Sequence, residues 1–91
     1  MATDNFYPTP SDGWVKVTAA GVNFIKIRSN TPNHAFFVTS SGSDPDLSVI
    51  GYKVDCEEFW CDVAVAESFY VRVTNEQPVR TRIDVFFVAS P

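Results

Sequence analysis

Two cysteines, Cys56 and Cys61, have the widest range of possible chemistry in this chain. Because four residues separate them, a hairpin loop would let the two thiols face each other and form a disulfide. Zinc would need two more ligands, and His34 is the only histidine, so a tetrahedral site would also require carboxylates. A cytosolic origin keeps thiols reduced. We therefore expect reduced thiols, no metal and no cofactor, with a disulfide as the alternative.

Three further groups of residues have side chains that could react or bind a metal ion, but they lack the spacing that such a site needs. The carboxylates of Asp44-Pro45-Asp46 suit calcium, but the further spaced ligands of a loop site are missing, so we expect them to bond to the turn backbone. His34 has serines near it in sequence only, without the context of an activated nucleophile. Glu57-Glu58 is typical of a solvated turn rather than of an acid–base pair. We therefore expect no catalytic residue and a protein that is not an enzyme.

Strands must position these groups, because apolar and polar residues alternate through most of the chain. The two clearest runs are residues 68–74 and 80–88, separated by the breaker Asn75-Glu76-Gln77-Pro78. A short polar loop between two alternating runs predicts an antiparallel hairpin. The side chains expected to face the core are Phe69, Val71, Val73, Ile83, Val85 and Phe87.

Five more runs complete the predicted fold. Gly51 lies within the run 49–55 and indicates a bulge or a close backbone approach there. Seven strands at spacings near ten residues predict an all-β fold, a small antiparallel β-sandwich of the immunoglobulin-like or jelly-roll-like kind. Residues 1–13 are expected to form a turn-rich N-terminal arm, and 14–91 a single β-sandwich domain. The additional strands are expected at 14–18, 22–28, 34–39, 49–55 and 59–63.

Composition narrows the classes of partner. The 91 residues suffice for one domain with a two-layer core but not for a deep cleft. The net charge of −4 argues against nucleic acid, which is bound through an excess of Lys and Arg. No apolar run is long enough to span a bilayer, and the first residues lack the pattern of a secretory signal. We expect synthesis in a cytoplasm, without export and without a membrane partner.

The residues expected on the outer side of the strands form a candidate binding surface. They combine aromatic and basic side chains, a composition that protein interfaces favour. Most of the basic residues come from three of the expected strands, whereas most acids fall between the third and the sixth, so we expect charge segregation suited to head-to-tail contact or docking. We expect the arm to be a frayed tail, and the alternative is that its two aromatics pack on a neighbouring subunit. The candidate interface comprises Phe24, Lys26, Arg28, Tyr70, Arg72, Arg82 and Phe86, with Phe6 and Tyr7 from the arm.

One pattern extends over roughly residues 13 to 75. It consists of an early Trp with a Val three residues later, an alternating strand that closes in Asn, an apolar strand, a Pro-containing loop, a Gly and an aromatic-x-Arg strand. This pattern resembles small β-sandwich modules of tailed bacteriophages, of the capsid decoration or cement type. The residues that form it are Trp14, Val17, Phe24, Ile27, Asn30, Val38, Pro45, Gly51, Tyr70 and Arg72.

The resemblance implies a virion structural protein, with capsid decoration as the favoured role. Such a protein would bind the major capsid protein or another virion protein on the outer capsid surface and stabilise the shell by binding alone. It would be a homo-oligomer, with a trimer favoured by analogy with cement proteins. The alternative is a carbohydrate- or receptor-binding module of a tail or fibre. Its stacking candidates are Trp14, Trp60, Tyr7 and Tyr52.

Overall fold

A computed structural model describes residues 2–18, 22–30, 34–40, 43–62, 67–74 and 81–89. These residues form eight strands and one short 3-10 helix, with no α-helix among them. In chain order the elements are β1 (Ala2–Phe6), η1 (Pro10–Asp12), β2 (Val15–Thr18), β3 (Val22–Ser29), β4 (Ala35–Ser40), β5 (Tyr52–Lys53), β6 (Glu58–Asp62), β7 (Ser68–Val73) and β8 (Ile83–Ala89).

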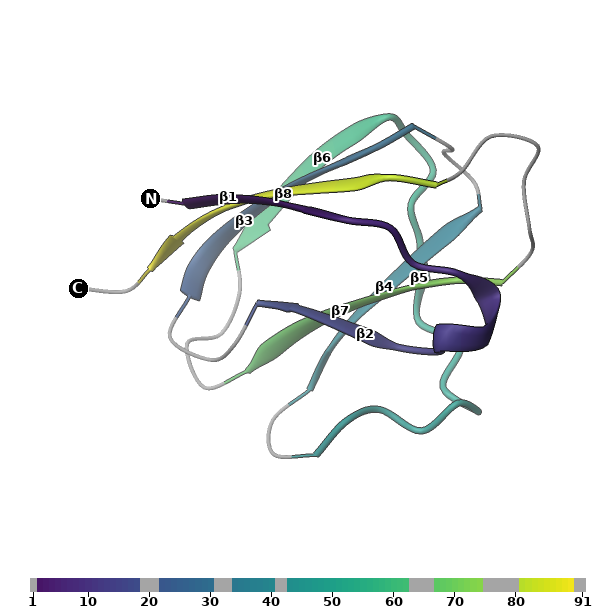
Figure 1. Cartoon of the computed structure of the whole chain (residues 1–91). Helices are drawn as coiled ribbons and strands as arrows, with labels where there is room; N and C mark the ends of the chain where they lie inside the picture. The colour runs from purple at the N-terminus through teal and green to yellow at the C-terminus, as the bar shows by residue number, and fades with distance from the viewer. Residues whose placement is uncertain are drawn as a thin grey trace.

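The strands form two four-stranded antiparallel sheets that lie one over the other (Figure 1). Sheet A has the order β1-β8-β3-β6, and sheet B has the order β2-β7-β4-β5. The prediction of a small all-β sandwich is confirmed. Sheet A carries the candidate functional site on the side that faces away from sheet B.

The core lies between the sheets, where the alternating patterns place their apolar side chains. Ile25 and Ile27 of β3 and Val71 of β7 are fully buried, as the alternation predicted. β-Branched residues suit these positions because their restricted side chains pack well on a pleated surface. Side chains from both sheets contribute to this single cluster, which comprises Val17, Ile25, Ile27, Ala35, Val54, Phe69, Val71, Ile83 and Val85.

The predicted hairpin between residues 68–74 and 80–88 is wrong. β7 pairs with β2 and β4 in sheet B, whereas β8 pairs with β1 and β3 in sheet A. Val71 and Val85 are both buried, but they reach the core from opposite sheets. Alternation indicates which face of a strand is buried, but it does not indicate which strands pair with that strand. Two runs that are adjacent in sequence can therefore be mistaken for a hairpin.

The first residues of the expected N-terminal arm form a strand of the sandwich. β1 pairs with β8 in a register that runs from Ala2 opposite Phe87 to Phe6 opposite Ile83, and Phe6 packs against the core. The pairing covers one edge of β8, whose backbone groups would otherwise lack partners. After β1, the chain turns through η1, where the Thr9 backbone N–H donates to Asp12 Oδ2 at 2.8 Å.

The expected fourth strand, 49–55, is reduced to the two residues of β5. Residues 43–51, called here the covering segment, lie across the outer face of β7 instead of extending sheet B. Its contacts are a hydrogen bond from Tyr70 to Asp44 and two from Arg72 to backbone carbonyls of the segment. Gly51 has a φ of 75° and lies against Trp14 and the Phe37 carbonyl. The predicted close approach at Gly51 is confirmed.

Candidate functional site: the outer face of sheet A

Sheet A presents an outer face because alternate residues of β3 point away from the core. Ile25 and Ile27 are buried, so Phe24, Lys26 and Arg28 lie on the opposite side. The strand register then fixes which side chains of the neighbouring strands lie beside them. The structure therefore groups the β3 members of the predicted interface with parts of β6, β8 and β1.

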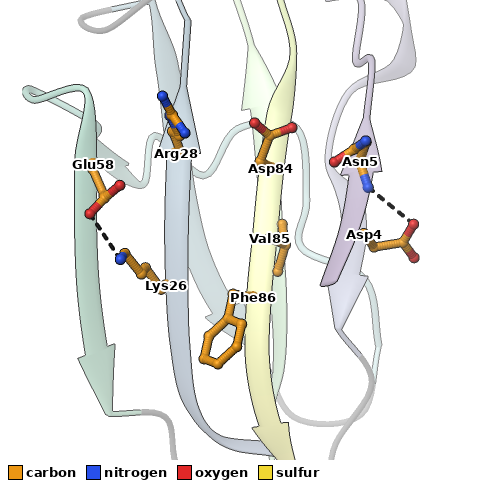
Figure 2. Close-up of a pocket in the computed structure, with 8 residues that line it drawn as sticks. All are labelled: Asp4, Asn5, Lys26, Arg28, Glu58, Asp84, Val85 and Phe86. Carbon is orange, nitrogen blue, oxygen red and sulfur yellow. Dashed lines mark hydrogen bonds and ion pairs between the residues drawn. The ribbon is translucent and has the colours of Figure 1, made fainter. Parts of the chain in front are cut away.

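Two rows of side chains cross this face. In the first row, Arg28 is opposite Glu58 of β6 on one side and Asp84 of β8 on the other, and Asp84 is opposite Asn5 of β1. In the second row, Lys26 lies between Trp60 and Phe86. Figure 2 shows the charged row above Phe86 on neighbouring strands.

The second row supplies most of the exposed apolar surface of this face. Trp60 is 64% exposed although it lies within a strand, and Phe86 is half-buried. Phe24 adds a half-buried ring one row further along, opposite Val88. Isolated exposed apolar residues are common on proteins, but aromatics aligned by strand register make a continuous surface of the kind that interfaces use.

Ion pairs in the first row and beside it neutralise most of the charges. Lys26 Nζ lies 3.0 Å from Glu58 Oε1, and Arg82 Nε lies 3.1 Å from Asp84 Oδ1. With its amide oriented to satisfy both of its polar groups, Asn5 also donates to Asp84 Oδ1, at 2.9 Å. Acids and bases are thus interleaved here, and the predicted charge segregation does not describe this face.

Arg28 is the exception among these charged groups. Its side chain is exposed and makes no hydrogen bond or ion pair with the residues that the structure describes. A shallow groove of about 280 Å³ passes beside it. The groove is lined by Asp4, Asn5, Lys26, Arg28, Glu58, Asp84, Val85 and Phe86 (Figure 2).

The structure places the β7 members of the predicted interface on the other side of the molecule. Tyr70 was expected to be exposed, but it is only 1% exposed, and its hydroxyl donates to Asp44 Oδ1 at 2.9 Å. Burial first, and then the bond and charge of Asp44, raise the pKa of the Tyr70 hydroxyl above its ordinary value. The expectation of an exposed Tyr70 is wrong because the covering segment lies over this side of β7.

Arg72 is held by the same segment. Its Nη1 donates to the Leu47 carbonyl at 2.9 Å, and its guanidinium lies 5.2 Å from the centre of the Trp14 ring. Arg72 therefore connects β7, the covering segment and Trp14. A surface that combines Arg72 with Lys26 and Phe86 does not exist, because these residues lie on opposite outer faces of the sandwich.

Two other parts of the predicted interface separate in the structure. Phe6 points toward the core and is partly buried, whereas Tyr7, just beyond β1, is 46% exposed. Trp14, a predicted stacking residue for carbohydrate, is 9% exposed and is packed beneath Arg72 and Gly51. Of the four stacking candidates, Tyr7, Tyr52 and Trp60 remain on the surface.

The residues considered above for covalent or metal chemistry make local contacts in the structure. Cys56 is a free, exposed cysteine whose thiol lies 3.1 Å from the Glu58 carbonyl, and the side chain of Cys61 lies outside the described residues. Asp46 accepts a hydrogen bond from the Ser48 backbone N–H, which lowers the pKa of its carboxyl group, as expected of a turn residue. Within the described ranges, no cluster of three or more potential ligands is arranged for a metal ion.

Sequence reasoning missed the contribution of β6 to this surface. Glu58, Trp60 and Asp62 alternate in sequence with Phe59 and Cys61, and this alternation was a usable signal. Leu47 and Ile50, which are 66% and 78% exposed on the covering segment, were also missed. No local pattern distinguishes an apolar residue on such a segment from one in the core.

Comparisons with known proteins leave the family of this chain open. No protein-family model matches the sequence, and no curated protein or solved structure is significantly similar to it. In the part of the chain that the structure describes, no helix has the length and apolar character of a membrane span.

Proposed function

We propose that this protein is a structural protein of a bacteriophage virion that acts by binding, as a decoration protein on the outer surface of the capsid. The phage assignment rests on the resemblance of residues 13 to 75 to small virion modules. The assignment to binding rather than catalysis rests on the outer face of sheet A. Decoration would stabilise the assembled shell by mass action, because only the assembled state presents the complete binding site.

One observation carries the choice of surface. Trp60 is 64% exposed on β6, in register with Lys26 and Phe86, so this face offers aromatic area beside paired charges. Interfaces concentrate their binding energy in a few such aromatic residues, which lose contact with water when the partner docks. The charged groups around them would set orientation and specificity more than affinity.

The proposed partner is the major capsid protein or another virion protein, and the proposed assembly is a homo-oligomer, with a trimer favoured. Closed rings use two different patches of one chain that complement each other. The exposed Leu47 and Ile50 of the covering segment supply apolar area for one of these patches, on the face opposite the capsid-binding surface.

The test mixes the purified protein with undecorated capsids and compares two matched variants. Trp60→Ala and Tyr52→Ala each remove one exposed aromatic side chain from an edge strand, but from different sheets. We expect Trp60→Ala to weaken capsid binding by about 1–3 kcal/mol and Tyr52→Ala to leave it unchanged. Failure of the wild-type protein to bind capsids would overturn the proposed function.

A carbohydrate- or receptor-binding role is the second candidate, because Trp60 and Tyr52 are 64% and 69% exposed. Sugars stack on such rings, which combine an apolar face with a polar edge. A glycan panel probed with the same proteins distinguishes the two roles. Glycan binding that is lost in either aromatic variant, together with no capsid binding, would favour this second function.

A further inference from the structure

Arg28 has charged neighbours on both sides, yet both already have other partners. The register places Glu58 on one side of Arg28 and Asp84 on the other. Lys26 pairs with Glu58 at 3.0 Å, and Asp84 Oδ1 accepts hydrogen bonds from Arg82 and Asn5. The Arg28 guanidinium thus keeps its planar set of N–H donors for a group that the described residues do not provide.

The pairing of its neighbours, rather than the overall charge of the groove, favours an anionic partner at Arg28, since the lining carries three acids and two bases. Each ion pair neutralises its own members, and in Figure 2 the Asp4 carboxylate points away from Arg28. The net charge of −4 acts weakly here, because exposed charges are screened beyond about 8 Å at physiological ionic strength. A carboxylate matches the geometry of a guanidinium and can form two parallel hydrogen bonds with it.

An apolar contact lies at a fixed distance from this charge. Phe86 is opposite Lys26, two residues from Arg28 along β3, so the two positions are separated by about 7 Å along the strand direction. An extended peptide has the same spacing between side chains at positions i and i+2. A carboxylate over Arg28 therefore places the side chain two residues away next to the half-buried Phe86 ring.

We propose that this groove binds an extended segment of a partner protein, in which an Asp or Glu pairs with Arg28 and an apolar residue two positions away packs on Phe86. The inference rests on the proposed function insofar as the partner is another protein. A second copy of the chain is disfavoured at the adjacent β6 edge of sheet A. If β6 strands of two copies paired antiparallel about Trp60, Glu58 would oppose Asp62 of the other copy, and like charges in that arrangement repel.

The test uses a short synthetic peptide with a Ser-Glu-Ser-Leu-Ser sequence and blocked ends, and a second peptide with Gln in place of Glu. The readout is the NMR signal of the Arg28 side-chain Nε–H and of the backbone amides of β3 and β8. We expect the Glu peptide to shift these signals with a dissociation constant of about 1 mM and the Gln peptide to bind about tenfold more weakly.

Two charge variants provide the matched control. Arg28→Gln and Lys53→Gln each remove one positive charge from an exposed position, the first on β3 and the second on β5. Binding of the Glu peptide should weaken about tenfold in Arg28→Gln, equivalent to about 1.4 kcal/mol, and should be unchanged in Lys53→Gln. Equal binding of the two peptides, equal loss in the two variants, or no shift with the Glu peptide would overturn the inference.

The outcome also separates this inference from the proposed function. Capsid binding that survives Arg28→Gln, together with no peptide binding, would leave the decoration role intact and remove the groove from it. Peptide binding by a protein that does not bind capsids would support the groove inference and overturn the decoration role. A shift of the Arg28 signal with protein concentration, without peptide, would identify a second copy as the occupant and overturn the proposal.

Discussion

Gly51 combines a backbone conformation and a packing position that other residues cannot occupy together. Its φ is 75°, and an added Cβ would lie 2.6 Å from Trp14 Cη2 and 2.8 Å from the Phe37 carbonyl oxygen. We expect Gly51→Ala to lower the free energy of unfolding by about 1–3 kcal/mol, as measured by urea denaturation. Gly51→Asn is the informative control, because Asn tolerates positive φ but keeps the Cβ. If Asn restored full stability, the close contacts would not be the cause.

Tyr70 gives the protein a predicted sensitivity to high pH. The pKa of Tyr70 in the folded protein is raised above its ordinary value, first by burial and then by Asp44. Its contribution to stability is therefore complete below about pH 10 and is lost as the pH rises through the folded-state pKa, since the unfolded chain releases the proton first.

Tyr70→Phe tests this effect. The substitution should cost about 1 kcal/mol at neutral pH, through loss of the hydrogen bond to Asp44, and should reduce the loss of stability above pH 10. Urea denaturation at a series of alkaline pH values measures both effects. Tyr52→Phe, which alters a tyrosine that is 69% exposed, should retain the alkaline loss. An unchanged pH profile in Tyr70→Phe would contradict the assignment.

At the scale of the strand, β7 contains a fully buried position, and an exposed position follows just after its end. Val71 is fully buried in the cluster between the sheets, whereas Thr74, just after the strand, is exposed. Val71→Asp should prevent folding, because burying an unpaired carboxylate costs several kcal/mol out of a total stability of about 5–14 kcal/mol for a chain of this size. Thr74→Asp, the matched control, should fold normally. Circular dichroism decides, and a folded Val71→Asp variant would contradict the observed burial.

β1 provides a second test at this scale, because its docking on β8 depends on one aromatic side chain. Phe6→Ala should lower the free energy of unfolding by about 2 kcal/mol, less than a fully buried Phe would cost, since this side chain is only partly buried. Phe6→Leu should keep most of the contact and lose less. Urea denaturation of both variants measures the difference. Equal stability of Phe6→Ala and the wild-type protein would mean that β1 is not fixed to the sandwich.

These strands show which part of the fold the sequence could predict. Alternation correctly placed Ile25, Ile27, Val71 and Val85 in the core, because side-chain direction along a strand is a local property. Pairing partners were not predictable, since β7 and β8 carry equivalent patterns yet belong to different sheets.

The candidate site was predicted only in part, for a related reason. Phe24, Lys26, Arg28 and Phe86 do share one face, because β3 and β8 are paired. Tyr70 and Arg72 have the same outward phase along β7, but a segment more than twenty residues away in sequence covers them. Coverage by a segment so far away in sequence cannot be detected in the local residue pattern of β7.

At the scale of the whole molecule, both sheets depend on one core. Ile27 and Val85 from sheet A pack in the same cluster as Val17 and Val71 from sheet B. Neither sheet can bury its inner face alone, so we expect a single cooperative unfolding transition in urea. Far-UV circular dichroism and tryptophan fluorescence should give the same midpoint. In a Trp60→Phe variant, fluorescence reports the buried Trp14 alone, and separate midpoints in this variant would indicate that the sheets unfold independently.

The pairing of β1 with β8 also determines how the molecule responds to mechanical force. Ala2 is opposite Phe87, and both lie at the end of the sandwich where Figure 1 marks the two chain termini. A pull applied through these two residues acts across the ladder, and the antiparallel hydrogen bonds lie in the direction of that pull. The bonds would therefore break one after another, from Ala2 toward Phe6. A force applied through both chain ends would separate β1 from β8 at a low value. A force that slides β1 along β8 would have to break all of these bonds together.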